Sequence, residues 1–319
     1  MQFATWNVNS LAVRLPQVLD WLSANPVDVL ALQETKLTDD KFPYDAFAQA
    51  GYQAHWFGQK TYNGVALLTK TEATEIVKNI PGFEDELARV ITGTVQGVRV
   101  IGAYFPNGQA PGSDKFEYKM EWLKALRNWV KTELAAHTQL LLMGDYNITF
   151  DDADVWDPEG MRDQIHCTDE ERYHLRALVA MGLHDSLRLF PQPPKSYSWW
   201  DYRDMAFRRN RGMRIDHILI SQSLRDRATA CVIDKTPRKN ERPSDHTPVV
   251  LTITPESNKS SGVNASFLSS PSSWILRVMV LRPMPNLLAA SMRRPRVLVK
   301  AAWIMRASKR RVSVSHTSS

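Results

Sequence analysis

Short apolar runs that end in a polar residue recur through the first 251 residues. The clearest run is 140–143, four apolar residues followed by Gly144, Asp145, Tyr146 and Asn147. An unbroken apolar run is typical of a strand buried on both faces, and we expect Asp145 and Asn147 to project beyond its end. Equivalent junctions lie at Asn7, Gln33-Glu34, Tyr104, Asp216-His217 and Asp245-His246. The pattern places polar strand ends where α/β sheets carry ligand sites.

Helical spacing separates several of these runs. Apolar residues from Leu11 to Leu22 recur on one face, and Asn25-Pro26 ends the pattern. A second helix is predicted over 113–135. A third begins at the capping box 168–171 and ends before Gly182.

The polar strand ends limit the possible chemistry. A single Gly-Asp pair after a strand is most often part of a turn, so Asp145 alone indicates little. Six such junctions carry more weight, because carboxylates buried together without partners cost several kcal/mol each. A divalent metal ion and a phosphate group would balance that charge. Solvated strand ends, for example at Glu34, are the alternative.

Length and composition indicate a globular domain with an additional segment. The chain has 319 residues, of which 43% are hydrophobic and 23% charged, and one α/β domain of about 250 residues leaves a remainder. Cys167 and Cys231 form neither a metal-ligand cluster nor a disulfide framework, which fits a reducing cytosol, so we expect a cytoplasmic protein. No apolar run approaches the roughly 18 residues of a membrane span, and the amino terminus has no secretion signal pattern.

The excess of positive charge lies entirely in residues 257–319. That segment contains 11 Lys/Arg and no Asp/Glu, whereas residues 1–256 contain 29 basic and 34 acidic residues, a net charge of −5. We therefore divide the chain into a catalytic domain, 1–256, and a basic, Ser-rich tail, 257–319. A disordered or loosely ordered appendage, an arm that adds non-specific DNA affinity, and a segment without selected function are the three alternatives for the tail.

Three polar segments each allow two interpretations. Loop 59–64, with Lys60 and Tyr62, suits contact with a sugar–phosphate backbone but also suits an ordinary hairpin connection. The acidic segment 151–154 lacks EF-hand spacing, and we interpret it as a solvated loop. Segment 198–214 mixes tryptophans with arginines. We favour a surface that stacks on sugars or bases and neutralises phosphates over a buried tryptophan pair beside solvated arginines.

Seven motifs across residues 1–254, together and in order, resemble exonuclease III, the bacterial member of the class II abasic-site endonucleases within the endonuclease/exonuclease/phosphatase superfamily. The motifs are Trp6-Asn7-Val8-Asn9-Ser10, Leu32-Gln33-Glu34-Thr35-Lys36, Gly64-Val65-Ala66-Leu67-Leu68, Tyr104-Phe105-Pro106-Asn107, Gly144-Asp145-Tyr146-Asn147, Asn210-Arg211-Gly212-Met213-Arg214-Ile215-Asp216 and Ser244-Asp245-His246. The resemblance implies a four-layered α/β sandwich, with two mixed sheets face to face and helices outside.

The resemblance also implies a metal site and a set of catalytic residues. Glu34 is then the principal Mg²⁺ ligand, with Mn²⁺ as a substitute metal, and the remaining metal residues are Asn7, Asp245 and Asp145. Asp145 would orient or deprotonate the attacking water, with Asn147 helping to place it. His246 would donate to a phosphate oxygen, with Asp245 fixing its tautomer. Tyr104 would contact the phosphate, and Asp216 would hold the cluster in position.

Further residues are predicted to bind the DNA. Arg89 would grip the DNA backbone, and Trp199 would form a wall of the sugar pocket. The other predicted contacts are Lys60, Tyr62, Asn107 and Arg211.

His166 departs from the pattern of the family it resembles. It falls where that family has a small residue, glycine or serine, next to the pocket for an abasic sugar. We hypothesise that its imidazole hinders an internal abasic nucleotide, which must swing out of the duplex, while a frayed 3′ end still fits. A shifted loop without functional effect is the alternative.

The sequence thus leads to three hypotheses for function. The favoured one is a monomeric, Mg²⁺-dependent DNA-repair nuclease that acts at damaged or recessed 3′ ends of double-stranded DNA, as a 3′→5′ exonuclease and 3′-phosphodiesterase or phosphatase. The second is an efficient abasic-site endonuclease of the same family. The third is a DNA-binding relative without catalysis.

Overall fold

Two mixed six-stranded sheets packed face to face form the centre of the structure, a computed structural model that describes residues 1–256. The first sheet has the order β13 (Ala228–Ile233), β14 (Val249–Ile253), β1 (Gln2–Asn7), β2 (Val29–Gln33), β4 (Val65–Thr69) and β3 (Gln53–Phe57). The second has the order β5 (Ala73–Lys78), β6 (Val90–Val95), β7 (Val98–Tyr104), β8 (Leu140–Asp145), β12 (Asp216–Ile220) and β9 (His184–Asp185). A separate short ribbon pairs β10 (Trp199–Trp200) with β11 (Gly212–Met213).

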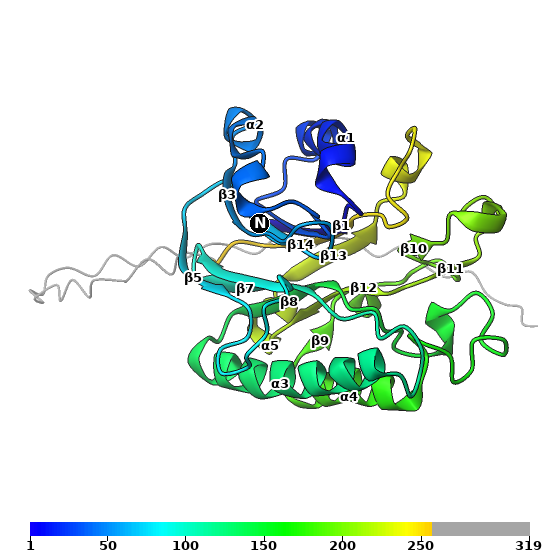
Figure 1. The fold of residues 1–319 in the computed structure, drawn as a ribbon. Coiled ribbons are helices and arrows are strands. Elements are labelled where there is room, and N and C mark those ends of the chain that lie inside the picture. The colour runs from blue at the N-terminus through cyan, green and yellow to red at the C-terminus, as the bar shows by residue number, and fades with distance from the viewer. Residues whose placement is uncertain (257–319) are drawn as a thin grey trace, which may run out of the picture. The chain divides into compact units, whose positions relative to one another are not determined.

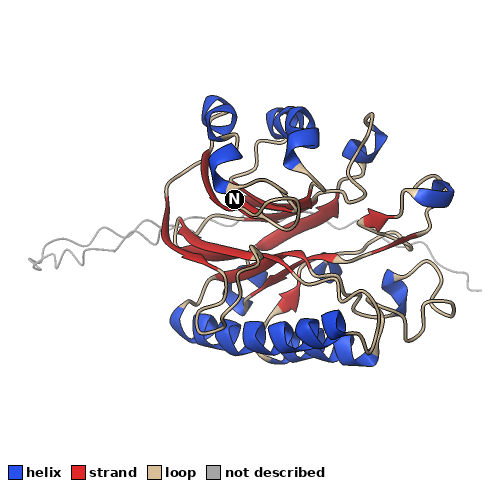
Figure 2. Ribbon diagram, viewed as in Figure 1, coloured by secondary structure: helices blue, strands red, loops and turns tan. Residues whose placement is uncertain are grey.

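Helices cover the outer face of each sheet (Figures 1 and 2). On the side of the first sheet lie α1 (Leu11–Ala24) and α2 (Tyr44–Gln49), and on the side of the second lie α3 (Asp114–Ala136), α4 (Asp169–Ala180) and the short α5 (Gln222–Arg225). Single 3-10 turns occupy Asp39–Lys41, Asp152–Asp154, Leu187–Leu189, Arg203–Met205 and Thr236–Lys239. The layers confirm the predicted four-layered sandwich.

Strand β8 shows why the sequence forms these layers. Leu141 and Met143 belong to the core between the two sheets, while Leu140 and Leu142 belong to the core between the second sheet and its helices. Successive side chains of a strand point to opposite faces, so an unbroken apolar run fills both cores at once. The prediction that 140–143 is a strand buried on both faces is confirmed.

Strand register brings the polar strand ends together. Tyr104 of β7 pairs with Asp145 of β8, and Asp216 of β12 pairs with the same residue from the other side. In the first sheet Asn7 of β1 pairs with Gln33 of β2, so Glu34 follows directly beyond that pair. The expected gathering of strand ends is therefore a consequence of hydrogen-bond register.

Gly144 is required by this register. A Cβ atom at this position would lie 1.8 Å from the carbonyl oxygen of Ala103 on the neighbouring strand. Any side chain would push β7 away from β8 and separate Tyr104 from Asp145. The glycine therefore serves close backbone approach rather than a turn.

Two predictions concern features beyond the catalytic sandwich. Within residues 1–256, no helix has the length and apolar character needed to cross a bilayer. The basic tail predicted over 257–319 lies outside the described residues, and its role stays a prediction.

Candidate active site

Three titratable side chains form the centre of the site. Ligand atoms of Glu34, Asp145 and His246 all lie within 4.8 Å of one another. The side-chain amide of Asn7 donates to Glu34 Oε1 and to Asp145 Oδ2, each at 2.9 Å. Asn7 thus joins the carboxylate of one sheet to the carboxylate of the other.

The donor atoms of this centre suit a hard divalent cation. Such cations prefer carboxylate and amide oxygens, which Glu34, Asp145 and Asn7 supply. Asn7 Oδ1 already accepts the backbone N–H of Asn9 at 2.9 Å and retains a second lone pair. With Asp216 and Asp245, four carboxylates surround the centre, so its residues fit a metal of this class.

Two nearby polar residues were not singled out from the sequence, although both stand inside quoted motifs. Lys36 Nζ lies 2.9 Å from Glu34 Oε2 and 2.5 Å from Asn9 Oδ1. The amide of Asn9 donates to Asp245 Oδ1 at 3.0 Å. Lys36 and Asn9 therefore link Glu34 to Asp245 at the mouth of the site.

The carboxylate that holds His246 is Asp216, and the prediction that Asp245 fixes its tautomer is wrong. His246 Nδ1 donates to Asp216 Oδ2 at 2.9 Å, while its Nε2 lies 3.6 Å from Asp145 Oδ2. Ser198 adds a hydrogen bond to the Asp216 carboxylate at 2.7 Å.

Asp245 instead contacts Asn9 and Trp199, which come from two distant segments of the chain. Its Oδ2 accepts the indole N–H of Trp199 at 2.9 Å, and its Oδ1 accepts Asn9. Trp199 also forms a β-bridge with His246 and so lies beside the candidate catalytic residues, while its role as a wall of the sugar pocket stays a prediction. The role of Asp245 as a metal ligand stays a prediction.

Burial and mutual charge shift the titration of this centre. Burial raises the pKa of the Asp145 carboxyl, and the nearby charge of Asp216 raises it further, against the opposing effect of His246. Burial would lower the pKa of His246, but Asp216, Asp145 and Asp245 together outweigh it and raise the pKa. At neutral pH His246 thus carries a proton on both nitrogens. Burial, followed by Glu34 and Asp145, raises the pKa of the Tyr104 phenol well above its usual value.

Asn147 is held by its backbone and its side chain. Its N–H donates to Asp145 Oδ1 at 2.9 Å, and its side-chain amide donates to the Phe105 carbonyl at 3.0 Å. Its φ of +50°, like that of +51° at Glu34, lies in the left-handed region, which is sparsely used outside glycine. Two predicted catalytic residues therefore occupy strained backbone positions.

His166 is in direct contact with Asn147. Its Nδ1 donates to the Asn147 carbonyl at 2.6 Å, its backbone N–H donates to Glu171 Oε1 at 3.1 Å, and its φ is +74°. Burial, then the charge of Lys119, lowers the pKa of His166 to about 4, so the ring is neutral at pH 7. Next to it Cys167 joins an apolar cluster with Val155, Met213 and Ile215, against which Trp199 packs. That apolar cluster was not predicted, because its members come from distant segments.

A buried ion pair between Lys119 and Glu171 contacts both Asn147 and His166. Lys119 Nζ donates to the Asn147 carbonyl at 2.8 Å and to Glu171 Oε1 at 2.5 Å, and both side chains are fully buried. The sequence predicted only a helix over 113–135 and only a helix cap at 168–171. The capping box is present, but its Glu171 also anchors His166, for which the sequence offers no signal.

The guanidinium of Arg89 packs against the ring of Tyr104. The guanidinium lies over the Tyr104 and Tyr118 rings, 5.2 and 5.6 Å from their centroids, and its Nε donates to the Tyr118 hydroxyl at 3.2 Å. The side chain is buried. Its predicted contact with the DNA backbone stays a prediction.

The other predicted DNA contacts lie on the surface. Lys60, Tyr62, Asn107 and Arg211 are all exposed, with Arg211 stacked 5.1 Å from the Trp156 ring. Asn107 reaches the centre through a long contact of 3.4 Å with Asn147 Oδ1. In segment 198–214 Trp200 is buried while Trp199 is half-buried at the site, and the predicted stacking on sugars or bases stays a prediction.

The interpretation of 151–154 as a solvated loop is wrong for its last residue. Asp154 is only 4% exposed, and its Oδ1 receives Arg214 Nε at 2.7 Å. Arg214 is itself buried and does not belong to an exposed basic run. The charge of Asp154 is compensated by Arg214, which lies 60 residues away in the chain, so the local sequence does not reveal the pairing.

Comparison with known proteins gives consistent results. Residues 4–246 match the model of the Endonuclease/Exonuclease/phosphatase family. Exodeoxyribonuclease III of Haemophilus influenzae is 36% identical, over 78% of this chain and 98% of its own length. The structure of the 3′ phosphatase NExo from Neisseria bound to a product DNA hairpin is similar with a TM-score of 0.79 and 45% identity, covering 80% of this chain and 99% of that chain. An AP endonuclease from Archaeoglobus fulgidus has a TM-score of 0.77 and 32% identity, covering 79% and 99%.

Proposed function

This chain belongs to the Endonuclease/Exonuclease/phosphatase family and is a hydrolytic DNA-repair nuclease, and from that premise we propose that it acts mainly at 3′ ends, as a 3′→5′ exonuclease and 3′-phosphodiesterase or phosphatase. The observation that carries this choice is the buried imidazole of His166, fixed against Asn147. A flipped internal abasic nucleotide needs room beside the catalytic residues, whereas a frayed 3′ end needs less. The similarity to a 3′ phosphatase supports the same choice.

We propose Mg²⁺ as the metal, with Mn²⁺ as a substitute. Glu34 and Asp145, with Asn7, would hold it, and bound there it would supply positive charge to the phosphate oxygens of the substrate. The surplus of carboxylates at the centre supports this assignment. His246 is a poor ligand for such a metal while it is protonated, and its proton has another use.

The side chains of this chain then divide the work of hydrolysis. Asp145, whose pKa is raised by burial, orients the attacking water and accepts its proton, and Asn147 helps to place that water. His246, held by Asp216, presents its Nε2 proton to a non-bridging phosphate oxygen. Tyr104 stays protonated because of its raised pKa and can donate to the phosphate as well.

Metal dependence is tested by chelation. The purified protein should degrade a duplex with recessed 3′ ends in Mg²⁺, lose this activity in EDTA and regain it when Mg²⁺ is restored in excess. Glu34→Gln should lose the activity in Mg²⁺ while still binding the duplex. Persistence of cleavage in EDTA would exclude the metal mechanism, and DNA binding without any cleavage would identify a non-catalytic relative.

Substrate preference is tested with His166→Gly on two labelled duplexes, one with an internal abasic analogue and one with a nick and a blocked 3′ end. The backbone bonds from residue 166 to Glu171 and from Thr149 remain available in the variant, and glycine fits the φ of +74° without strain. We expect the wild type to cut at the 3′ end and the variant to gain internal cleavage by roughly tenfold or more.

The matched control is His174→Gln, which removes another buried imidazole, on α4. It should leave the ratio of the two activities unchanged. Equal cutting of both duplexes by the wild type would favour the second candidate, an efficient abasic-site endonuclease, which the similarity to the Archaeoglobus fulgidus enzyme supports.

A further inference from the structure

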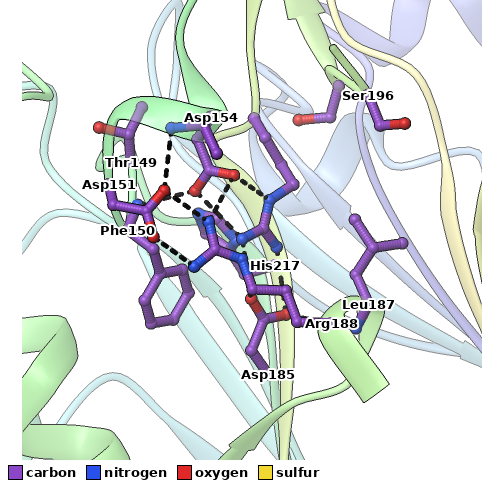
Figure 3. A network of polar contacts seen from close by, with 12 residues as sticks. Thr149, Phe150, Asp151, Asp154, Asp185, Leu187, Arg188, Ser196 and His217 are labelled. Carbon is purple, nitrogen blue, oxygen red and sulfur yellow. Dashed lines mark hydrogen bonds and ion pairs between the residues drawn. The ribbon is translucent and has the colours of Figure 1, made fainter. Parts of the chain in front are cut away.

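A second group of charged side chains lies beside the site, and we call it the Arg214 cluster: Asp154 and Arg214, which are buried, Asp185, which is half-buried, and Asp151 and Arg188, which are exposed. Arg214 donates to Asp154 Oδ1 and Asp185 Oδ2, each at 2.7 Å, and Arg188 donates to Asp151 Oδ2 at 2.6 Å and to Asp154 Oδ1 at 2.9 Å. Figure 3 shows the side chains of Asp151, Asp154, Asp185 and Arg188 converging from separate segments.

Asp154 joins the segment after Asn147 to the strand that carries Asp216. Its Oδ2 accepts the backbone N–H of Phe150 at 2.9 Å, while its carbonyl accepts the N–H of Arg214 at 2.9 Å. Arg214 stands two residues before Asp216, the partner of His246. The Asp154 carboxylate and the Arg214 guanidinium therefore help to fix segment 148–155 relative to β12, together with backbone contacts such as the Val155–Met213 bridge.

The same segment holds the backbone of His166. The N–H and the hydroxyl of Thr149 both donate to the His166 carbonyl, at 2.8 and 2.9 Å. His217 on β12 donates from Nε2 to the Ile148 carbonyl at 2.8 Å. A displacement of 148–155 would therefore move His166, while Asn147 keeps its own bonds to Asp145 and Lys119.

Each carboxylate of the cluster is paired with a guanidinium, so the cluster offers little to a ligand. Arg214 is only 2% exposed. Burial raises the pKa of the Asp154 carboxyl, but Arg214, His217 and Arg188 together lower it below its usual value. Buried ion pairs seldom stabilise a fold more than apolar residues of the same volume would, so geometry is their better-attested use.

We propose that Arg214 is a positioning residue for substrate selection: through Asp154 it fixes segment 148–155, and with it His166, at a set distance from the Asp216–His246 pair. This inference rests on the proposed role of His166. Loosening the cluster lets the imidazole move aside and opens the space that it fills. The chemistry at the phosphate is affected less, because Asp145, Asn147 and His246 keep their direct hydrogen bonds.

The test is Asp154→Asn in the full chain, assayed under single turnover on the two duplexes described above. We expect the ratio of internal to 3′-end cleavage to rise roughly tenfold, while the 3′-end rate stays within about threefold of the wild type. Arg214→Lys, which keeps the charge but not the two-pronged geometry, should shift the ratio in the same direction. Melting temperatures of all variants establish that they are folded.

The control is Glu133→Gln, which breaks the other buried Arg–carboxylate pair, Arg99–Glu133 at 2.6 Å, at the opposite end of β7. It should leave the ratio unchanged. In the double variant Asp154→Asn/His166→Gly, the ratio should equal that of His166→Gly alone, because the cluster acts through the imidazole.

Three outcomes would overturn the inference: an unchanged ratio in Asp154→Asn, equal loss of both activities, or a shift that persists in the His166→Gly background. Failure of His166→Gly itself to change the ratio would instead contradict the role proposed for His166, and equal cutting by the wild type would contradict the 3′-end preference. The two failures are therefore distinguishable.

Discussion

Two groups of carboxylates, one around the candidate metal site and one in the Arg214 cluster, differ in how their charge is balanced. Around the metal centre, four carboxylates belong to Glu34, Asp145, Asp216 and Asp245, and the ion pairs to them within residues 1–256 come from Lys36 and His246. In the Arg214 cluster, three carboxylates face two arginines through many short contacts.

Buried acidic residues alone therefore do not identify a catalytic site. Where arginines satisfy the oxygens, the acids fix segments of the chain. Where negative charge remains in excess, the fold stores an unfavourable interaction that a metal and a phosphate can relieve. The pKa values of two buried histidines differ accordingly. At the candidate metal site the carboxylates raise the pKa of His246, whereas near the Arg214 cluster burial and then Arg214 lower the pKa of His217.

The largest effect is expected from Asp145→Asn. Losing the group that accepts the proton of water should reduce the cleavage rate roughly a thousandfold. Because the native carboxylate is buried with its pKa raised, its removal should leave the melting temperature unchanged or higher. Asp154→Asn should do the opposite, lowering the melting temperature while retaining 3′-end cleavage. Rate assays and thermal melts of both variants check this, and a destabilised Asp145→Asn would remove the contrast.

Arg214→Met should produce the next largest effect, on stability. The change leaves Asp154 and Asp185 buried without their main partner, which costs about 3–5 kcal/mol when one member of a buried pair is removed. At about 2–4 °C per kcal/mol for a domain of this size, the melting temperature should fall by roughly 10 °C.

The control for that variant is Arg203→Met, which breaks the exposed Arg203–Asp201 pair of the same chemistry. Its melting temperature should be close to that of the wild type. Similar destabilisation of both variants would show that burial does not distinguish the Arg214 cluster.

The smallest effect is a pH dependence of stability from His217. Burial, then Arg214, lowers its pKa to about 4 from the ordinary 6.5. Between pH 6.5 and 4 the imidazole of His217 is protonated in the unfolded chain but not in the folded chain. The contribution of His217 to the free energy of unfolding is therefore fully present above pH 6.5 and is lost as the pH falls towards 4. At pH 5.5 the loss amounts to about 1 kcal/mol.

Urea midpoints at pH 7.5 and 5.5 measure this dependence. His217→Gln can still donate to Ile148 and should reduce the dependence without abolishing it, because burial also lowers the pKa of His166 and of His174 to about 4. An unchanged slope in His217→Gln would mean that His217 is charged in the folded protein.

The strands that carry the site follow from the sequence alone. Runs such as 140–143 are apolar on both faces, so their burial follows from composition. Strand register then gathers the polar strand ends of both sheets. Motif order identified Glu34, Asp145, Asn147 and His246, which the structure brings together. Short edge elements such as β3, β5 and β13 were missed, because their exposed faces weaken the apolar pattern.

The pairing of the buried charges could not be predicted from the sequence. Asp216 rather than Asp245 holds His246, Arg214 lies against Asp154, and Lys119 lies under Asn147. Each of these contacts joins residues 28 to 60 positions apart in the chain. Local periodicity records which face of an element is buried, but the partner of a buried charge depends on strand register and on the packing of sheet against helix. The physical reason is that electrostatic compensation acts through space, whereas sequence patterns report neighbours along the chain.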